Sequence, residues 1–319
     1  MRSPAALALL LAAGPCLAQA PAACTDSVHR QFDFWVGRWI VSNPAGVRLG
    51  TNEVTVELNG CVVQESWTAA GGDRGRSLNA PDPDGRWHQT WVAERLGHLR
   101  MSGGMAGDTM VLEGRRVEQG SGIEYRDAFR WIASGRDTVR QLGLLEVPAR
   151  DVTSRFQGVY VRSDTLPGFA RPPGGACADT SRSAASRRLD FWVGTWRVEG
   201  EDGGGMSTVT TDLGGCLFEE RYRGTGGVSA IAWTYYDVLE GSWYRTYADD
   251  RGAWRQFRGD LDDGVLVLRA TDDSVTRLRV APRGGGIAMV SEHSTDGGIS
   301  WRIVGEQRYI PTRKAGRLD

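Results

Sequence analysis

The strongest constraint on the fold of this chain is an internal repeat. Residues 32–41 read FDFWVGRWIV and residues 189–198 read LDFWVGTWRV. Later motifs correspond in the same order: GCVVQESW (60–67) with GCLFEERY (215–222), and WHQTW (87–91) with WYRTY (243–247). Elements that recur at a similar spacing indicate a duplicated domain. The chain has 319 residues, and single hydrophobic cores stop growing at roughly 250–300 residues, so two copies of one domain are predicted.

Each copy is composed of short runs in which apolar and polar residues alternate. EVTVELNG (53–60) and GVLVLRA (264–270) have the period of two that is typical of strands. The Asp-Gly pair within TDGGISW (295–301) is a hairpin signal. Closing a series of antiparallel strands into a barrel removes the exposed sheet edges. The prediction is therefore an all-β protein made of two tandem antiparallel β-barrels.

Composition also predicts the domain boundaries and an exported protein. Residues 1–20 combine Arg2, an apolar run and small residues at Ala18 and Ala20, which is typical of a signal peptide cleaved after one of these two alanines. The apolar run is too short to span a bilayer, so a periplasmic or secreted protein without a membrane span is expected. The predicted segments after the signal peptide are the first barrel (21–163), a Pro/Gly-rich linker (164–175), the second barrel (176–312) and a tail (313–319).

The cysteines follow the repeat. Cys24 and Cys61 lie on either side of the first FWVG motif, and Cys177 and Cys216 lie on either side of the second. Four cysteines allow three pairings, and an even number in an exported chain favours disulfides. The repeat selects Cys24–Cys61 and Cys177–Cys216. Catalytic thiols or a zinc site are less favoured, because neither a CxxC spacing nor a nearby histidine is present.

Several of these motifs resemble a known family. Gly37-Arg38-Trp39 and Gly194-Thr195-Trp196 resemble the first-strand GxW motif of lipocalins and the wider calycin superfamily. Together, FDFWVGRW, GCVVQESW, Ser77-Leu78-Asn79, GRWHQTWV and DTMVLEG resemble the uncharacterised bacterial DUF1579 family over most of residues 30–115. Copy two matches that family at FWVGTW, GGC, GSWYRTY and STDGGISW…RYI. The resemblance implies lipocalin-like barrels with Trp39 and Trp196 on the barrel floor, and it implies no established activity.

The motifs also contain candidate site residues, because barrel strands direct alternate side chains inward. In each copy two strands place aromatic residues beside one or two polar residues. These pocket candidates are Glu65, Trp67, Trp87, Gln89 and Trp91 in copy one, and Glu220, Tyr222, Trp243, Arg245 and Tyr247 in copy two. A buried carboxylate needs a partner, and Arg245 is a candidate partner for Glu220, whereas Gln89 stands there in copy one. The alternative is that the aromatic residues are ordinary core and that both glutamates cap loops or face water.

Three functions are compatible with these patterns. The leading hypothesis is binding of a small apolar or aromatic ligand without catalysis. The alternatives are an enzyme that uses Glu65 or Glu220 as a general acid or base, and a tandem-barrel interaction module in which one copy has lost its cavity. The net charge of −1 gives no reason to expect nucleic acid, and the oligomeric state is left open. No metal and no cofactor is predicted, because the chain has no GxSxG, HExxH or phosphate-loop motif and its four histidines lack ligand spacing.

Overall fold

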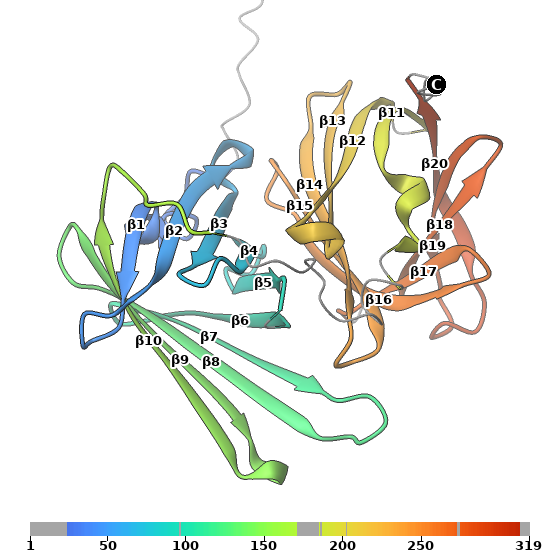
Figure 1. The fold of residues 1–319 in the computed structure, drawn as a ribbon. Helices are drawn as coiled ribbons and strands as arrows, with labels where there is room; N and C mark the ends of the chain where they lie inside the picture. Colours follow the sequence, from blue (N-terminus) through green and yellow to red (C-terminus); the bar gives the residue numbers. More distant parts are fainter. Residues whose placement is uncertain are drawn as a thin grey trace, which may run out of the picture.

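The computed structural model describes residues 24–95, 97–170, 185, 187–201, 203–272 and 275–312. Their strands form two closed antiparallel barrels of ten strands each, β1–β10 and β11–β20, which lie side by side (Figure 1). The prediction of an all-β fold with two tandem barrels is confirmed. The predicted signal peptide and tail, and residues 171–175 of the predicted linker, lie outside the described residues.

In both barrels each strand pairs with its neighbours in sequence and the first strand pairs with the last. The elements of the first barrel are η1 (Asp33–Trp35), β1 (Gly37–Ser42), β2 (Arg48–Glu57), η2 (Leu58–Gly60), β3 (Val62–Ala69), β4 (Arg74–Pro81), β5 (Trp87–Ala93), β6 (His98–Ala106), β7 (Thr109–Val117), β8 (Glu124–Ala133), β9 (Thr138–Val147), η3 (Pro148–Arg150) and β10 (Val152–Arg162). Those of the second are η4 (Asp190–Trp192), β11 (Gly194–Gly200), β12 (Gly205–Asp212), η5 (Leu213–Gly215), β13 (Leu217–Gly224), β14 (Ser229–Asp237), β15 (Ser242–Asp249), β16 (Trp254–Asp262), β17 (Val265–Ala270), β18 (Thr276–Arg283), β19 (Gly286–His293) and β20 (Arg302–Pro311).

The GxW motif has the same local geometry in each copy. A short 3-10 helix precedes it, and the indole N–H of Trp39 donates to the carbonyl of Trp35 at 2.9 Å, as Trp196 does to Trp192 at 3.0 Å. Gly37 has a φ of +146°, and a Cβ there would lie 2.0 Å from the Arg162 guanidinium. That guanidinium lies 4.3 Å from the Trp39 ring, a cation–π distance. The glycine therefore provides both the backbone conformation and the space that the arginine needs.

The disulfide between Cys24 and Cys61 is present and fixes the N-terminal segment to the start of β3. Arg30 supports it by donating to the carbonyl of Gly60 at 2.5 Å. Cys216 also takes part in a disulfide, and Cys177, its predicted partner, lies outside the described residues.

Removing the first disulfide is expected to destabilise the protein. The Cys24→Ala, Cys61→Ala variant should lose about 2–4 kcal/mol of unfolding free energy, because the bridge constrains the unfolded chain. Urea denaturation of the oxidised variant and wild type measures the difference. Reduced wild type is the control and should be at least as unstable as the variant. An unchanged unfolding free energy in the variant would contradict the stabilising role.

The strand register corrects one correspondence suggested by the sequence. The alignment of the copies pairs Ser77 with Ser229. In the sheets, however, Ser77 lies opposite Glu65, and Ala232 lies opposite Glu220. The structural equivalent of Ser77 is therefore Ala232, so the hydroxyl beside the first glutamate has no counterpart in copy two.

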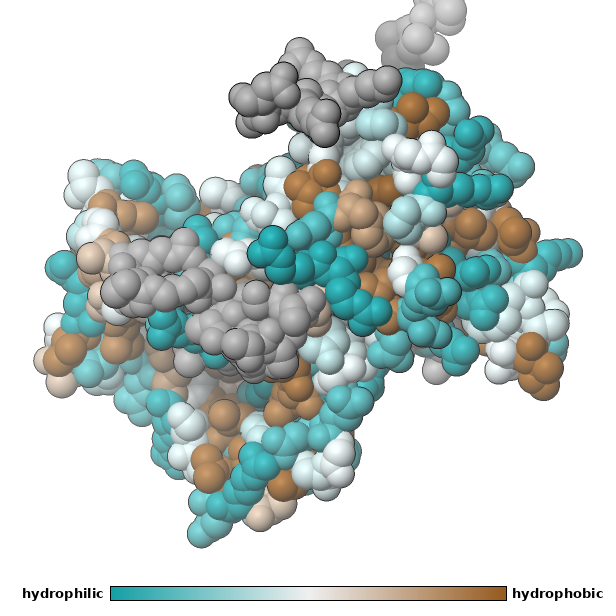
Figure 2. Space-filling model, turned by 45° about the vertical axis from the view of Figure 1, so that its right-hand side comes forward, coloured by the Kyte–Doolittle hydropathy of each residue, from teal (hydrophilic) through white to brown (hydrophobic). Residues whose placement is uncertain are grey.

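The barrels pack against each other through the outward-facing side chains of β3–β6 and β13–β16. A buried apolar cluster joins them, and its members are Val62, Leu78, Ala80, Val92, Leu213, Cys216, Leu217, Ile231, Trp233, Tyr235, Tyr244, Ala248 and Trp254. The equivalent residues Thr90 and Thr246 share a hydrogen bond of 2.8 Å across this junction. On the face drawn in Figure 2, the hydrophobic residues lie in small groups among hydrophilic ones.

Candidate functional site

One end of the first barrel is filled by aromatic side chains. Phe32 stacks on Trp35 at 4.9 Å and meets Trp87 edge to face at 5.4 Å. Trp39 and Trp131 complete this plug, and all five residues are at most 1% exposed. Of the pocket candidates, Trp87 lies here, and its indole N–H is bound by Gln31 at 2.9 Å. This end of the barrel is packed core.

A layer of polar side chains lies next to the plug, with Glu65 in it. The Glu65 carboxylate accepts from Asn52 Nδ2 at 2.9 Å and from Ser77 Oγ at 2.8 Å. Gln89 donates to Asn79 Oδ1 at 2.6 Å. Among the described residues no cation pairs with Glu65, and Asn52 Oδ1 is buried without a hydrogen-bond partner. The layer therefore holds a carboxylate without a cation and an amide oxygen without a donor.

Burial controls the protonation of this carboxyl. Loss of solvent raises the pKa of Glu65 from 4.5 to about 7, although the hydrogen bonds from Ser77 and Asn52 oppose the shift. Tyr160 on β10 faces the same layer, where its hydroxyl donates to Gln141. Burial, together with the Glu65 charge, raises the pKa of Tyr160. Glu65 thus changes charge near neutral pH while Tyr160 stays neutral.

The open end of the first barrel is aromatic and partly reached by solvent. Half-buried side chains line it: Trp67, Trp91, Leu99, Phe129 and Phe156. Trp67 and Phe156 meet edge to face at 6.5 Å. Gly75 lies beneath the Trp91 ring, since a Cβ there would lie 2.2 Å from it, and Gly50 lies beneath Trp67 in the same way. The missing side chains let both indoles lie against the barrel wall. We call these five residues the mouth.

The second barrel has an equivalent polar layer that is internally neutralised. Glu220 accepts from Arg245 at 2.5 Å, from Ser207 Oγ at 2.6 Å and from the Tyr309 hydroxyl at 2.9 Å. The Arg245 guanidinium also donates to Thr234 at 2.9 Å and lies 4.9 Å from the Trp192 ring. The predicted pairing of Arg245 with Glu220 is confirmed.

The remaining candidates of copy two lie around this ion pair. Trp243 packs in the buried core beside Phe218, and Trp196 is 7% exposed in the same cluster. Tyr222 donates to the carbonyl of Gly204 at 3.2 Å, and Tyr247 donates to Asp249 at 3.1 Å. The hydroxyl groups of both tyrosines thus have partners within the protein.

Sequence reasoning missed several members of the polar layers: Asn52, Ser77, Gln141, Tyr160, Ser207 and Tyr309. A usable signal was present for Tyr160 and Tyr309, because both copies end on a strand with a tyrosine near its last residues. For Asn52 and Ser207 the signal was a polar residue at an inward position of an otherwise alternating strand.

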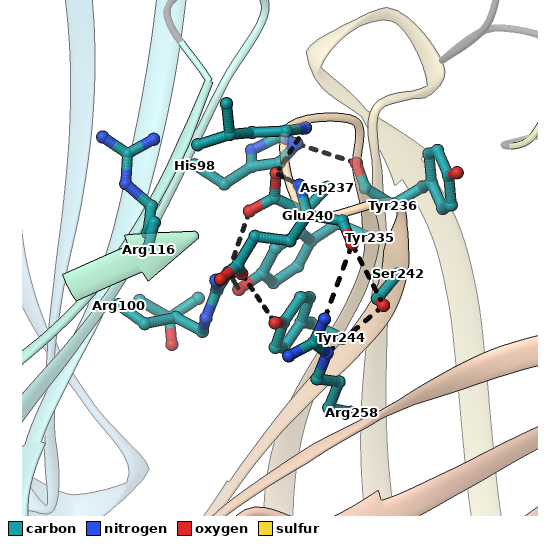
Figure 3. Close-up of polar contacts among 12 residues, drawn as sticks. His98, Arg100, Arg116, Tyr235, Tyr236, Asp237, Glu240, Ser242, Tyr244 and Arg258 are labelled. Carbon is teal, nitrogen blue, oxygen red and sulfur yellow. Dashed lines mark hydrogen bonds and ion pairs between the residues drawn. The ribbon is translucent and has the colours of Figure 1, made fainter. Parts of the chain in front are cut away.

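A second polar cluster holds the barrels together (Figure 3). Arg100 of β6 donates to Asp237 at 3.1 Å and pairs with Glu240, and its guanidinium lies 3.6 Å from the Tyr244 ring. Tyr244 donates to Glu240 at 2.6 Å. Both carboxylates bind this one arginine, and such a buried, shared ion pair between two domains is typical of a structural contact.

The comparisons with known proteins leave the family open. No protein-family model matches the chain, and no curated protein is a significant match. One solved structure covers 89% of this chain and 98% of its own length at 10% identity, a crystal structure of a DUF3598-family protein of unknown function from Nostoc punctiforme PCC 73102. Its TM-score to this chain is 0.25.

Two features hold for the described residues as a whole. None of their helices is long and apolar enough to cross a membrane. They also contain no group of three or more His, Cys, Asp or Glu side chains arranged to hold a metal ion.

Proposed function

We propose that the first barrel binds a small apolar or aromatic molecule at its mouth, above the layer that contains Glu65. One observation carries the proposal: half-buried aromatic side chains surround a polar layer in which an acceptor, Asn52 Oδ1, has no partner. Small-molecule sites are generally built in this way, with apolar walls and a few convergent polar groups. We also propose kinship with the lipocalin-like DUF1579 barrels, and a closed barrel fold is compatible with such a role.

In this proposal the second barrel is the structural partner. Arg245, Ser207 and Tyr309 donate hydrogen bonds to Glu220. Both oxygens of that carboxylate therefore already have partners within the protein. The second barrel packs against the first barrel through the apolar junction and the Arg100 cluster. The tandem then provides one binding barrel and one supporting barrel.

We also propose that the protein works outside the cytoplasm, in the periplasm or after secretion. The Cys24–Cys61 disulfide supports this, because disulfides form and persist in oxidising compartments. The leader-like residues 1–20 agree with it.

The mouth can be tested with a neutral aromatic dye, N-phenyl-1-naphthylamine, whose fluorescence rises in an apolar site. Wild type is expected to bind it, and Trp67→Ala or Trp91→Ala should weaken binding about tenfold or more, because each removes a large apolar contact. The equivalent substitutions Tyr222→Ala and Tyr247→Ala in the second barrel are the matched controls and should leave the dye affinity unchanged. Equal losses in both barrels, or no dye binding by wild type, would contradict the proposal.

A further inference from the structure

The two polar layers can be compared residue by residue because the strand registers match. Asn52 lies opposite Trp67 and Ser207 lies opposite Tyr222, which makes Asn52 and Ser207 equivalent. Gln89 lies opposite Asn79. Arg245 lies opposite Thr234, so Arg245 stands at the position of Gln89. The two glutamates therefore share one position, and only the second has a cation beside it.

The second barrel shows what this glutamate position binds. Its carboxylate holds a guanidinium at 2.5 Å, and the same guanidinium is oriented by a hydroxyl and by the face of Trp192. Charge-assisted bonds between arginine and carboxylate are among the stronger hydrogen bonds in proteins. Glu220 and Arg245 are each 4% exposed, so the two charges neutralise each other away from bulk solvent.

The first barrel keeps the carboxylate and lacks the cation. Four of the nearby donor groups already have partners: Asn52 Nδ2 and Ser77 Oγ bind Glu65, Gln89 Nε2 binds Asn79, and the Tyr160 hydroxyl binds Gln141. The groups that can still accept hydrogen bonds from a ligand are the Glu65 carboxylate and Asn52 Oδ1. Two acceptors, one of them a carboxylate, match a head group that has several N–H donors and a positive charge.

The surroundings of that head group differ between the barrels. Trp35, the equivalent of Trp192, already packs against Phe32 and Trp131. Its ring is therefore part of the plug. The indoles of Trp67 and Trp91 at the mouth are the aromatic faces left for a cation or for the apolar part of its carrier.

We propose that the ligand of the first barrel is a small organic cation, a guanidinium, amidinium or primary ammonium with an aromatic or apolar body. Its head group pairs with Glu65 as Arg245 pairs with Glu220, and its body lies between Trp67 and Trp91. This inference rests on the proposed function and specifies the ligand's chemistry.

The pairing makes binding depend on pH. A cation is held by the ionised form of Glu65, and the groups that contact or face this carboxyl, Asn52, Ser77 and Tyr160, carry no charge near neutral pH. The charged groups on the inward faces of β7 and β8, Arg116 and Asp127, form a buried ion pair with each other. With a Glu65 pKa of about 7, cation binding is expected to be about tenfold weaker at pH 6 than at pH 8, in proportion to the ionised fraction.

The test uses two probes of the same shape, benzamidine, which is a cation at both pH values, and neutral benzamide. Isothermal titration at pH 8 should show benzamidinium binding wild type about tenfold or more tightly than benzamide. Glu65→Gln should remove that preference and its pH dependence. Gln89→Arg, which supplies the cation internally as in the second barrel, should also remove it. Glu53→Gln, at an outward and half-exposed position of β2, is the charge control and should change neither probe's binding.

Binding of N-phenyl-1-naphthylamine to each variant separates this inference from the proposed function. If the dye binds and is displaced equally by benzamidine and benzamide, or if the preference persists in Glu65→Gln, the cation inference is wrong and the proposed function stands. If the dye and both probes fail to bind folded wild type, the proposed function is wrong and the inference falls with it.

Discussion

Replacing Arg100 by methionine is expected to lower the free energy of unfolding by about 3–5 kcal/mol, because it leaves buried carboxylates without their cation. Asp237 and Glu240 are 2% and 7% exposed in their side chains, and both pair with this guanidinium. Methionine keeps the apolar length of the side chain over Tyr244 and removes only the charge and the donors. Urea denaturation at pH 7 measures the loss.

The pH dependence of that loss identifies its cause. Burial alone would raise the pKa of Asp237, but the charges of Arg100 and His98 and the hydrogen bonds from Arg100 and the Glu240 backbone together outweigh it, so the pKa of Asp237 is lowered in the wild type. Stability from this pair is therefore present above the unfolded pKa and lost as pH falls through the folded one. In the variant, burial acts without the guanidinium, and protonating the carboxylates relieves the penalty. The difference between wild type and variant should shrink from pH 7 to pH 4.

Arg115→Met is the matched control for this experiment. Arg115 is 68% exposed and pairs with Glu124 at the surface, so its loss should cost less than about 1 kcal/mol. A loss for Arg100→Met that is no larger than the loss for Arg115→Met would show that the cluster in Figure 3 does not stabilise the junction.

The fold could be predicted because its determinants are local and occur twice. Alternation along each strand requires only that one face be buried, and the repeated Gly37 and Gly194 mark a backbone conformation with φ of +146° and +153°. The Cys24–Cys61 pairing followed from the same duplication. Glu220 and Arg245 could be paired in advance because opposite charges on inward faces have few other partners.

The junction between the barrels could not be predicted from the sequence. Arg100, Asp237 and Thr90 lie on outward faces. The alternation of residues along a strand predicts that such side chains point away from the barrel, but it does not predict which residues they contact. The polar layer was incomplete for a related reason. Asn52 and Ser77 reach Glu65 from neighbouring strands, and their positions depend on the strand register. Matching identical residues in the two copies gave the wrong register here, because it paired Ser77 with Ser229.

Glu65→Gln is expected to stabilise the protein at pH 8 and to change its stability little at pH 4. The folded pKa of about 7 lies above the unfolded value of 4.5, so the folded state holds a proton that the unfolded state has lost between these pH values. Stability therefore falls as pH rises through this window, by about 3 kcal/mol once the carboxyl is ionised in both states. Glutamine has nearly the same shape and never ionises, so it avoids this loss. Thermal or urea unfolding from pH 4 to pH 8 measures the effect.

Glu220→Gln gives the opposite expectation from the equivalent position. It leaves the Arg245 guanidinium, 5% exposed in its side chain, without its carboxylate, and should destabilise the protein by about 3–5 kcal/mol at pH 8. Destabilisation by both substitutions at pH 8 would mean that Glu65 is held ionised by a partner, as Glu220 is. A gain for Glu65→Gln alone would show that the first barrel maintains a destabilising carboxyl. Natural proteins commonly keep such groups where binding requires them, which is the role proposed here for Glu65.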